Sequence, residues 1–303
     1  MRLVRIGTRG STLAVAQSSW VRQQLLRQHR EIEVELRVIK TSGDRFLDVP
    51  IPEVGGKGVF TKEIEDALLG GEIDLAVHSM KDLPTELADG LAIVAVPKRE
   101  DARDVLVTRN QCRLGELAAG ARVGTGSLRR RAQVLYHRAD LIVAPVRGNI
   151  DTRLRKLDEG EMDALVMAAA GLKRIGREDR IGEYLSDEVC VSAVAQGALA
   201  IEARDTAAIR DLLGFLHDAE ASTEVSAERA LLARLGGGCH VPIGARARIA
   251  GGHLKMIAVV AHSDGRGVYR GEIAGTATEA SQLGQRLAEQ LLLQGADKFL
   301  ESP

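Results

Sequence analysis

Short apolar runs alternate with amphipathic stretches along the first third of the chain. Leu3–Ile6, Leu75–Val77 and Leu91–Val96 are predicted strands. Glu33–Val38 alternates strictly between charged and apolar residues, which is typical of a half-buried strand. A predicted helix, Thr61–Leu69, stops at a pair of glycines. Strands that alternate with helices in this way indicate a mostly parallel sheet with helices on both faces.

The first predicted helix follows the first strand directly. Ser11 and Thr12 stand at its start, where a hydroxyl accepts a hydrogen bond from a free backbone N–H group. The apolar face that we expect for this helix consists of Ala16, Trp20, Val21 and Leu25.

A charged segment at 98–101 interrupts the pattern, and the alternation then restarts. Strands are predicted at Ala121–Gly124, Leu141–Val146 and Ala164–Met167, and helices are predicted to end at Arg138, Leu157 and Arg174. The last third differs, because Thr223–Leu235 and Thr278–Leu293 are long amphipathic helices. Between them, His253–Val260 and Gly267–Ile273 flank a Ser-Asp-Gly-Arg turn and are predicted to form a hairpin.

These patterns predict an α/β protein with two doubly wound lobes, similar to bilobal periplasmic binding proteins, and a small α+β C-terminal domain. Residues 1–97 with 198–216 make the first lobe, and residues 102–191 make the second. Residues 98–101 and 192–197 are the expected hinge crossovers, and residues 219–303 form the α+β domain. A length of 303 residues is consistent with more than one domain.

Composition excludes several classes of function. The net charge is −1 and only 3% of residues are aromatic, so a general polyanion binder or a base-stacking platform is not expected. The three cysteines are an odd number without metal-ligand spacing, which predicts no metal site and a reducing, cytoplasmic location. No segment has the length and apolarity of a signal peptide or a membrane span.

Positive charge is nevertheless concentrated in one part of the chain. Between Arg122 and Lys156 there are nine Lys or Arg residues and two acidic residues. Several of them follow predicted strand ends or begin helices, where an open parallel sheet binds ligands and free N–H groups attract anions. A single arginine usually belongs to a solvated surface, but this placement predicts a ligand with many carboxylates or phosphates, because guanidinium pairs with carboxylate in a bidentate manner.

Asp82 is an acidic residue among cations, in the segment His78-Ser79-Met80-Lys81-Asp82-Leu83-Pro84. A carboxylate beside positive charge stays ionised, so it is able to stabilise a developing cation or to move a proton. A role as a helix cap or an ion-pair partner remains an alternative, and His78 and His240 are expected to be structural.

Cys239 follows three glycines and precedes Pro242. Glycines leave room for a large group to approach the sulfur, whereas a structural cysteine needs no such room. The run indicates a loop that carries something bulky on the thiol. The alternative is a glycine-rich turn in which a cysteine happens to occur.

Taken together, these motifs resemble the porphobilinogen deaminase family, also called hydroxymethylbilane synthases. The matching segments run in order from residue 3 to beyond residue 244, and they are Thr8–Ser11, Val54–Gly58, Ala76–Pro84, Gly124–Arg130, Arg147–Asn149 with Thr152–Leu154, Ala170–Arg174 and Gly237–Gly244. Three positions depart from the family pattern. Gly126 stands where serine is usual, Ser192 where proline is usual and Ala195 where glycine is usual.

The resemblance implies a transferase of heme and tetrapyrrole biosynthesis that joins four porphobilinogens into hydroxymethylbilane and releases ammonia. It implies a dipyrromethane cofactor linked to Cys239 and the essential aspartate at Asp82. It places cofactor-binding residues at Lys81, Asp82, Thr125, Ser127, Arg129, Arg130 and Gly171. It places substrate-binding residues at Arg9, Ser11, Lys57, Phe60, Arg147, Arg153, Arg174 and Gln196.

The expected partner is therefore the small molecule porphobilinogen, bound by a cytoplasmic monomer without nucleic acid or membrane. One alternative is a non-catalytic, bilobal anion receptor, since a fold does not determine a function. That alternative explains the lobes and the arginines but not the thiol on its glycine loop. A nucleic-acid binder using Arg129–Arg131 is a second alternative, and the near-neutral pI of about 6.7 argues against it.

Overall fold

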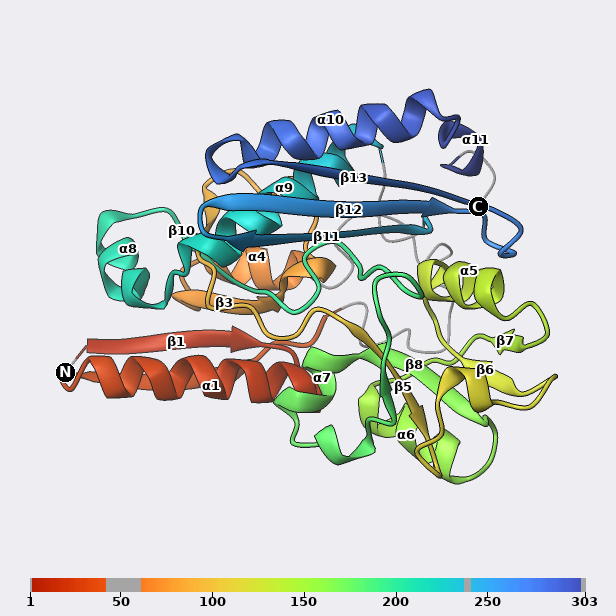
Figure 1. Cartoon of the computed structure of the whole chain (residues 1–303). Coiled ribbons are helices and arrows are strands. Elements are labelled where there is room, and N and C mark those ends of the chain that lie inside the picture. The colour runs from red at the N-terminus through yellow and green to blue at the C-terminus, as the bar shows by residue number, and fades with distance from the viewer. Residues whose placement is uncertain (1, 42–60, 237–240, 301–303) are drawn as a thin grey trace. The chain divides into compact units, whose positions relative to one another are not determined.

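The structure is a computed structural model that describes residues 2–41, 61–236 and 241–300 (Figure 1). The chain divides into two compact units. The first unit contains Met1–Arg99 and Ala198–Ser222, and the second contains Glu100–Gly197 and Thr223–Pro303. The predicted division into three domains with hinges remains a prediction.

The first unit contains a five-stranded sheet in the order β2-β1-β3-β10-β4. Strand β1 pairs in parallel with β2 and β3, whereas β10 runs antiparallel to both β3 and β4. The sheet is thus mostly parallel, as expected, with one reversed strand. Its elements are β1 (Arg2–Thr8), α1 (Thr12–Gln28), β2 (Ile32–Val38), α4 (Lys62–Leu69), β3 (Leu75–Ser79), the short 3-10 turn η1 (Met80–Asp82), β4 (Leu91–Ala95), β10 (Leu199–Arg204), α8 (Ala207–Leu213) and η4 (Gly214–Leu216).

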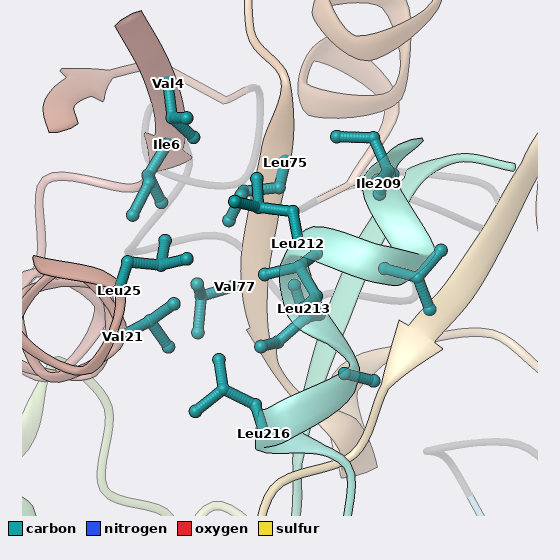
Figure 2. Packing of buried hydrophobic residues seen from close by; sticks show 14 of the residues in the cluster. Val4, Ile6, Val21, Leu25, Leu75, Val77, Ile209, Leu212, Leu213 and Leu216 are labelled. Atoms are coloured by element: carbon teal, nitrogen blue, oxygen red, sulfur yellow. The ribbon is translucent and has the colours of Figure 1, made fainter. Parts of the chain in front are cut away.

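Helix α1 begins at the predicted cap, because the Ser11 side chain accepts a hydrogen bond from the Ala14 N–H group at 3.3 Å. Figure 2 shows Val21 and Leu25 of this helix in the same apolar cluster as the strand residues of β1 and β3. Trp20 was expected on this buried face, and that prediction is wrong: its side chain is 41% exposed. Gln17 and Ser18 are buried instead, so the buried face includes polar residues that an apolar pattern does not mark.

The second unit contains another five-stranded sheet, in the order β7-β6-β8-β5-β9. Strands β6, β7 and β8 are parallel, and β5 is antiparallel to β8 and β9. The elements are β5 (Asp104–Thr108), η2 (Leu114–Glu116), β6 (Arg122–Gly124), α5 (Leu128–His137), β7 (Ile142–Ala144), α6 (Ile150–Asp158), β8 (Ala164–Ala168), α7 (Ala169–Arg174), η3 (Glu178–Arg180) and β9 (Glu183–Tyr184).

The same unit contains a three-stranded antiparallel sheet, β11-β12-β13, which confirms the predicted hairpin and adds a strand before it. Gly271 and Gly275 of β13 lie against leucines of α10, which packs on this sheet (Figure 1). The elements are α9 (Ala219–Arg234), β11 (Ile243–Ala250), β12 (His253–Ala261), β13 (Val268–Thr276), η5 (Ala277–Glu279), α10 (Ala280–Leu293) and α11 (Asp297–Leu300).

Candidate functional site

The expected anion-binding residues of the second unit follow strand ends at one edge of its sheet. Strands β6, β7 and β8 are parallel, so their carboxyl ends lie at the same edge. Strand β5 runs the other way and begins at that edge, with Asp104 paired to Ala168 at the end of β8. Strand β6 lies between β7 and β8, so the next two strands in the chain pair with it on opposite sides. The strand order therefore reverses at the end of β6. Open α/β sheets bind ligands at such a point.

A polar turn and a helix start follow β6. The Ser127 side chain caps α5 by accepting a hydrogen bond from the Arg130 N–H group at 3.5 Å, and the Ser127 N–H group donates to the Thr125 hydroxyl at 3.3 Å. This geometry places Arg129 and Arg130 in the first turn of α5. It therefore brings together Thr125, Ser127, Arg129 and Arg130, four of the residues expected to bind the cofactor.

Arg129 and Arg130 both contact Asp104, which sequence reasoning did not single out. Arg129 Nη1 lies 2.5 Å from Asp104 Oδ2, and Arg130 Nε donates to Asp104 Oδ1 at 2.9 Å. The Arg129 and Arg130 side chains are 4% and 7% exposed, and Asp104 is not exposed at all. The one sequence signal for Asp104 was an aspartate that directly precedes three apolar residues. It is the first residue of β5, whose residues are all buried.

The charges in this cluster do not balance. Burial by itself raises the pKa of the Asp104 carboxyl, but the charges of Arg129 and Arg130 outweigh it and hold that pKa well below its usual range. The Cys190 thiol donates to Asp104 Oδ2 at 3.3 Å, and burial followed by the Asp104 charge raises the pKa of Cys190, which keeps the thiol neutral. Two guanidinium groups and one carboxylate thus give the cluster a net charge of +1.

Gln196 joins the same cluster from the second crossover. Its amide Nε2 donates to Asp104 Oδ1 at 2.9 Å and to the Ala102 carbonyl at 2.7 Å, and its Oε1 accepts from Arg130 Nη2 at 3.2 Å. This residue was expected to bind substrate. The structure places it beside the two buried arginines.

Arg147 and Arg153 follow β7, the strand next to β6 at this edge of the sheet. Arg147 is exposed, and Arg153 on α6 donates through Nε to the Gly148 carbonyl at 2.8 Å. Gly126 lies close to this segment, since a Cβ atom there would stand 3.0 Å from the Val146 carbonyl oxygen and 4.0 Å from Arg153 Nη2. A serine at position 126 would therefore crowd the backbone that precedes Arg147.

Gly171 and Arg174 lie on α7, which follows β8. Gly171 is buried, and Arg174 Nη2 donates to the Gly197 carbonyl at 2.6 Å. Burial lowers the pKa of the Arg174 guanidinium to about 10, and the negative charge of Glu100 opposes this effect. Arg174 thus contacts Gly197, the last residue of the second crossover.

The expected residues of the first unit lie on two neighbouring strand ends. Arg9 and Ser11 follow β1, and Lys81 and Asp82 form η1 directly after β3, the parallel neighbour of β1. The backbone of η1 is anchored at its start, where the Met80 N–H group donates to the Ala198 carbonyl at 3.0 Å. Asp82 itself is exposed, so its carboxylate is accessible to a ligand.

A buried histidine lies next to a buried glutamate just ahead of that turn. His78 Nε2 is 2.9 Å from Glu202 Oε2, with side chains 8% and 0% exposed. The ring N–H group is not aimed at the carboxylate, and within the described part of the chain neither Glu202 oxygen accepts a hydrogen bond. Burial raises the pKa of the Glu65 carboxyl, and the negative charge of Glu202 raises it further. His78 is thus buried against an acid, in keeping with a structural role.

Three expected site residues lie outside the described residues: Cys239, Lys57 and Phe60. Within the described ranges 2–41, 61–236 and 241–300, no group of three His, Cys, Asp or Glu side chains is placed to hold a metal ion. No helix in those ranges is long and apolar enough to cross a membrane.

Comparisons with known proteins cover nearly the whole chain. Two family models match it: "Porphobilinogen deaminase, dipyromethane cofactor binding domain" over residues 4–210 and "Porphobilinogen deaminase, C-terminal domain" over residues 222–293. The porphobilinogen deaminase of Pelobacter propionicus is 50% identical over 301 residues, covering 99% of this chain and 97% of that protein. That of Syntrophotalea carbinolica is 50% identical over 298 residues, covering 98% and 95%.

Among solved structures, a putative methionine-binding lipoprotein of Bacillus subtilis matches with a TM-score of 0.45 and 13% identity, over 73% of this chain and 92% of that chain. That likeness is too distant to bear on the assignment. The family models, over residues 4–210 and 222–293, and the relatives give the same family. The chain belongs to the porphobilinogen deaminase family.

Proposed function

We propose that this chain is a transferase that joins four porphobilinogen molecules head to tail into hydroxymethylbilane, releasing ammonia, on a dipyrromethane cofactor linked to Cys239. The observation that carries the proposal is the buried pair Arg129 and Arg130, whose two positive charges meet only one negative charge on Asp104. A cytoplasmic monomer that binds neither nucleic acid nor membrane is the working form that we propose.

The residues present fit such a cofactor. Each of its pyrrole rings carries an acetate and a propionate, and one carboxylate would balance the positive charge of the Asp104 cluster. Thr125 and Ser127, together with the first turn of α5, supply hydroxyl and N–H donors next to that charge. When bound, the cofactor supplies the free pyrrole position on which chain growth starts.

Asp82 is the catalytic residue in this proposal. Loss of ammonia from porphobilinogen leaves an electron-poor methylene pyrrole, and positive charge spreads over both rings as the attacking pyrrole bonds to it, until that pyrrole loses a proton. An exposed carboxylate on the short turn after β3 is able to stabilise that charge without reorganising. Lys81 lies beside it in sequence, and Arg9 and Ser11 on the neighbouring strand end would hold substrate carboxylates.

The arginines of the second unit divide into two groups by burial. Arg129 and Arg130 are buried on Asp104 and would hold the cofactor. Arg147 is exposed and Arg153 is half-buried, so they remain accessible to the carboxylates of incoming substrate or of the growing chain. Gln196 belongs to the second crossover and bonds to Asp104, and Arg174 contacts the last residue of that crossover, so we expect both to contact the same ligand.

The experiment that tests the cofactor assignment is the intact mass of the protein purified from a heme-making host. Wild type should carry a two-pyrrole mass increment and react in a pyrrole colour test. Cys239→Ser should have neither, whereas Cys112→Ser, which changes a different cysteine, should keep both. An unmodified wild-type mass would remove the cofactor assignment.

A further inference from the structure

Glu228 is a fully buried carboxylate in the second unit, outside the arginine edge described above. It lies on α9 and is 0% exposed. Its Oε2 accepts a hydrogen bond from the Ala195 N–H group at 2.6 Å, and its Oε1 accepts one from the Ala247 N–H group at 2.7 Å. Both oxygens of one side chain are thus bonded to backbone groups of two separate segments.

The two segments are far apart in the sequence and lie on either side of α9. Ala247 belongs to β11, and Ala195 belongs to the second crossover between the lobes. The loop that carries Cys239 connects the end of α9 to the start of β11. Glu228 therefore joins both elements that flank the cysteine loop, and it fixes them to the crossover.

The Ala195 backbone requires such a partner. Its φ is 59°, in the left-handed region that an alanine side chain disfavours. A buried N–H group without an acceptor is costly, and a carboxylate is a strong acceptor for it. The Glu228 contact satisfies this donor, so the strained conformation at Ala195 depends on a residue of the C-terminal part of the chain.

Other contacts hold β11 against the crossover and against the residues just before it. The Ala245 N–H group donates to the Ser192 carbonyl at 2.9 Å, and a Cβ atom on Gly244 would lie 2.7 Å from the Val191 carbonyl oxygen. Arg246 Nη1 pairs with Asp187 Oδ1 at 2.9 Å. The C-terminal elements and the second α/β sheet accordingly fall into one compact unit.

We propose that Glu228 is a positioning residue that fixes α9 and β11, the elements before and after Cys239 in the sequence, to the second crossover, so that these C-terminal elements move with Arg129 and Arg130 during chain growth. This rests on the proposed function, because it assumes a cofactor on Cys239. The consequence is that cofactor and cofactor-binding arginines keep their mutual geometry while substrate units are added.

Glu228→Gln tests the proposal, because an amide has only one oxygen and must present an N–H group to one of two backbone donors. Glu224→Gln is the matched control. Glu224 lies one turn earlier on α9, and its Oε1 accepts from Ile249 N–H of β11 at 3.0 Å, a contact that does not involve the crossover. Both variants weaken the packing of α9 on β11, and only the first releases Ala195.

Turnover should be measured at a temperature at which both variants are folded, with native mass spectrometry after a pulse of porphobilinogen. Glu228→Gln should retain the two-pyrrole increment, lose turnover by roughly ten- to a hundredfold, as misplacement of about 1 Å does, and accumulate species with incomplete chains. Glu224→Gln should give the wild-type distribution. Equal distributions in the two variants would overturn the proposal, whereas an absent increment in wild type would instead refute the cofactor assignment.

Hydrogen exchange of the wild-type enzyme tests the same proposal if Glu228→Gln does not fold. The amides of Ala195 and Ala247 share one carboxylate, so both should be protected to the same degree before and after addition of porphobilinogen. Control amides in β12 should stay protected throughout. Independent opening of the crossover and β11 would contradict the proposal.

Discussion

Asp104 decides how the arginines of this site are arranged. It accepts hydrogen bonds from both Arg129 and Arg130, and three apolar residues follow it in its strand. The sequence shows a dense group of arginines, but the pattern does not distinguish those that are buried on an acid from those that remain exposed. That difference depends on which strand end comes next to α5, and strand order is not visible in local sequence.

Arg129→Leu should yield mostly cofactor-free protein that unfolds more readily. The change removes the hydrogen bonds that Arg129 donates to Asp104 Oδ2 and to the Val191 carbonyl, and a hydrogen bond to a charged group contributes about 1.5–3 kcal/mol. Arg131→Leu is the control, because Arg131 is the exposed neighbour on the same helix. Intact mass and thermal unfolding measure both effects, and equal behaviour of the two variants would show that Arg129 is not part of the site.

Arg147→Leu and Arg153→Leu should act at a later stage than Arg129→Leu. Both residues are less buried and lie away from Asp104, so the cofactor should be retained while chains stall at incomplete length. Loss of one charged contact costs about 1.5–3 kcal/mol, or roughly ten- to a hundredfold in affinity. Native mass spectrometry separates the two groups, and loss of cofactor in all of these variants would make the arginines a single undivided site.

Asp104 should also give the enzyme a defined acid sensitivity. Its folded-state pKa is depressed by Arg129 and Arg130, so its stabilising contribution is present above the unfolded pKa of about 4 and is lost as the pH falls through the folded-state value. The difference in free energy of unfolding between wild type and Asp104→Asn should therefore be largest near neutral pH and shrink below about pH 4. Denaturant titrations across pH measure this, and a difference that grows in acid would contradict the assignment.

Asp82→Asn should separate cofactor assembly from turnover. The substitution keeps the size of the side chain and removes its negative charge, so the cofactor should remain while turnover falls by roughly a hundredfold or more. Asp89→Asn, a change at another acid of the first unit, should leave turnover unaltered. Near-normal turnover of Asp82→Asn would remove this residue from the mechanism.

At the scale of elements, the alternation of apolar and polar residues predicted most strands and helices, and capping residues predicted where several helices begin. Ser11 and Ser127 both accept the hydrogen bonds that define helix starts. The reversed strands β5 and β10, and the added strand β11, were not predicted. Strand direction and pairing depend on contacts between segments far apart in sequence, for which a local pattern contains no signal.

Ala195→Gly should stabilise the second crossover. The left-handed conformation at this residue costs an alanine about 1–2 kcal/mol, and glycine adopts it without that cost. Glycine loses more entropy on folding by about 0.4–1 kcal/mol, so a net gain of about 0–1.6 kcal/mol in the free energy of unfolding is expected. Ala193→Gly, two residues away, is the control and should not stabilise, because no positive φ occurs there. A destabilised Ala195→Gly protein would mean that no strain is present at this residue.

At the scale of the whole molecule, each of two compact units places charged residues at strand ends where its strand order reverses. The matched relatives span nearly the entire chain, so family membership covers both units. Sequence reasoning reached that family from its motifs. The sequence alone does not identify the acids Asp104, Glu202 and Glu228. They are recognised by their burial and by contacts with residues distant in sequence.

The central claim is that this chain carries a covalent primer and extends it by four units of porphobilinogen. Native mass spectrometry of the wild-type protein after a brief pulse of porphobilinogen tests it most directly. The proposed function predicts a starting species with a two-pyrrole increment and discrete species with added pyrrole units up to four, followed by a return to the starting mass on release. A single unmodified species that never gains mass would contradict it.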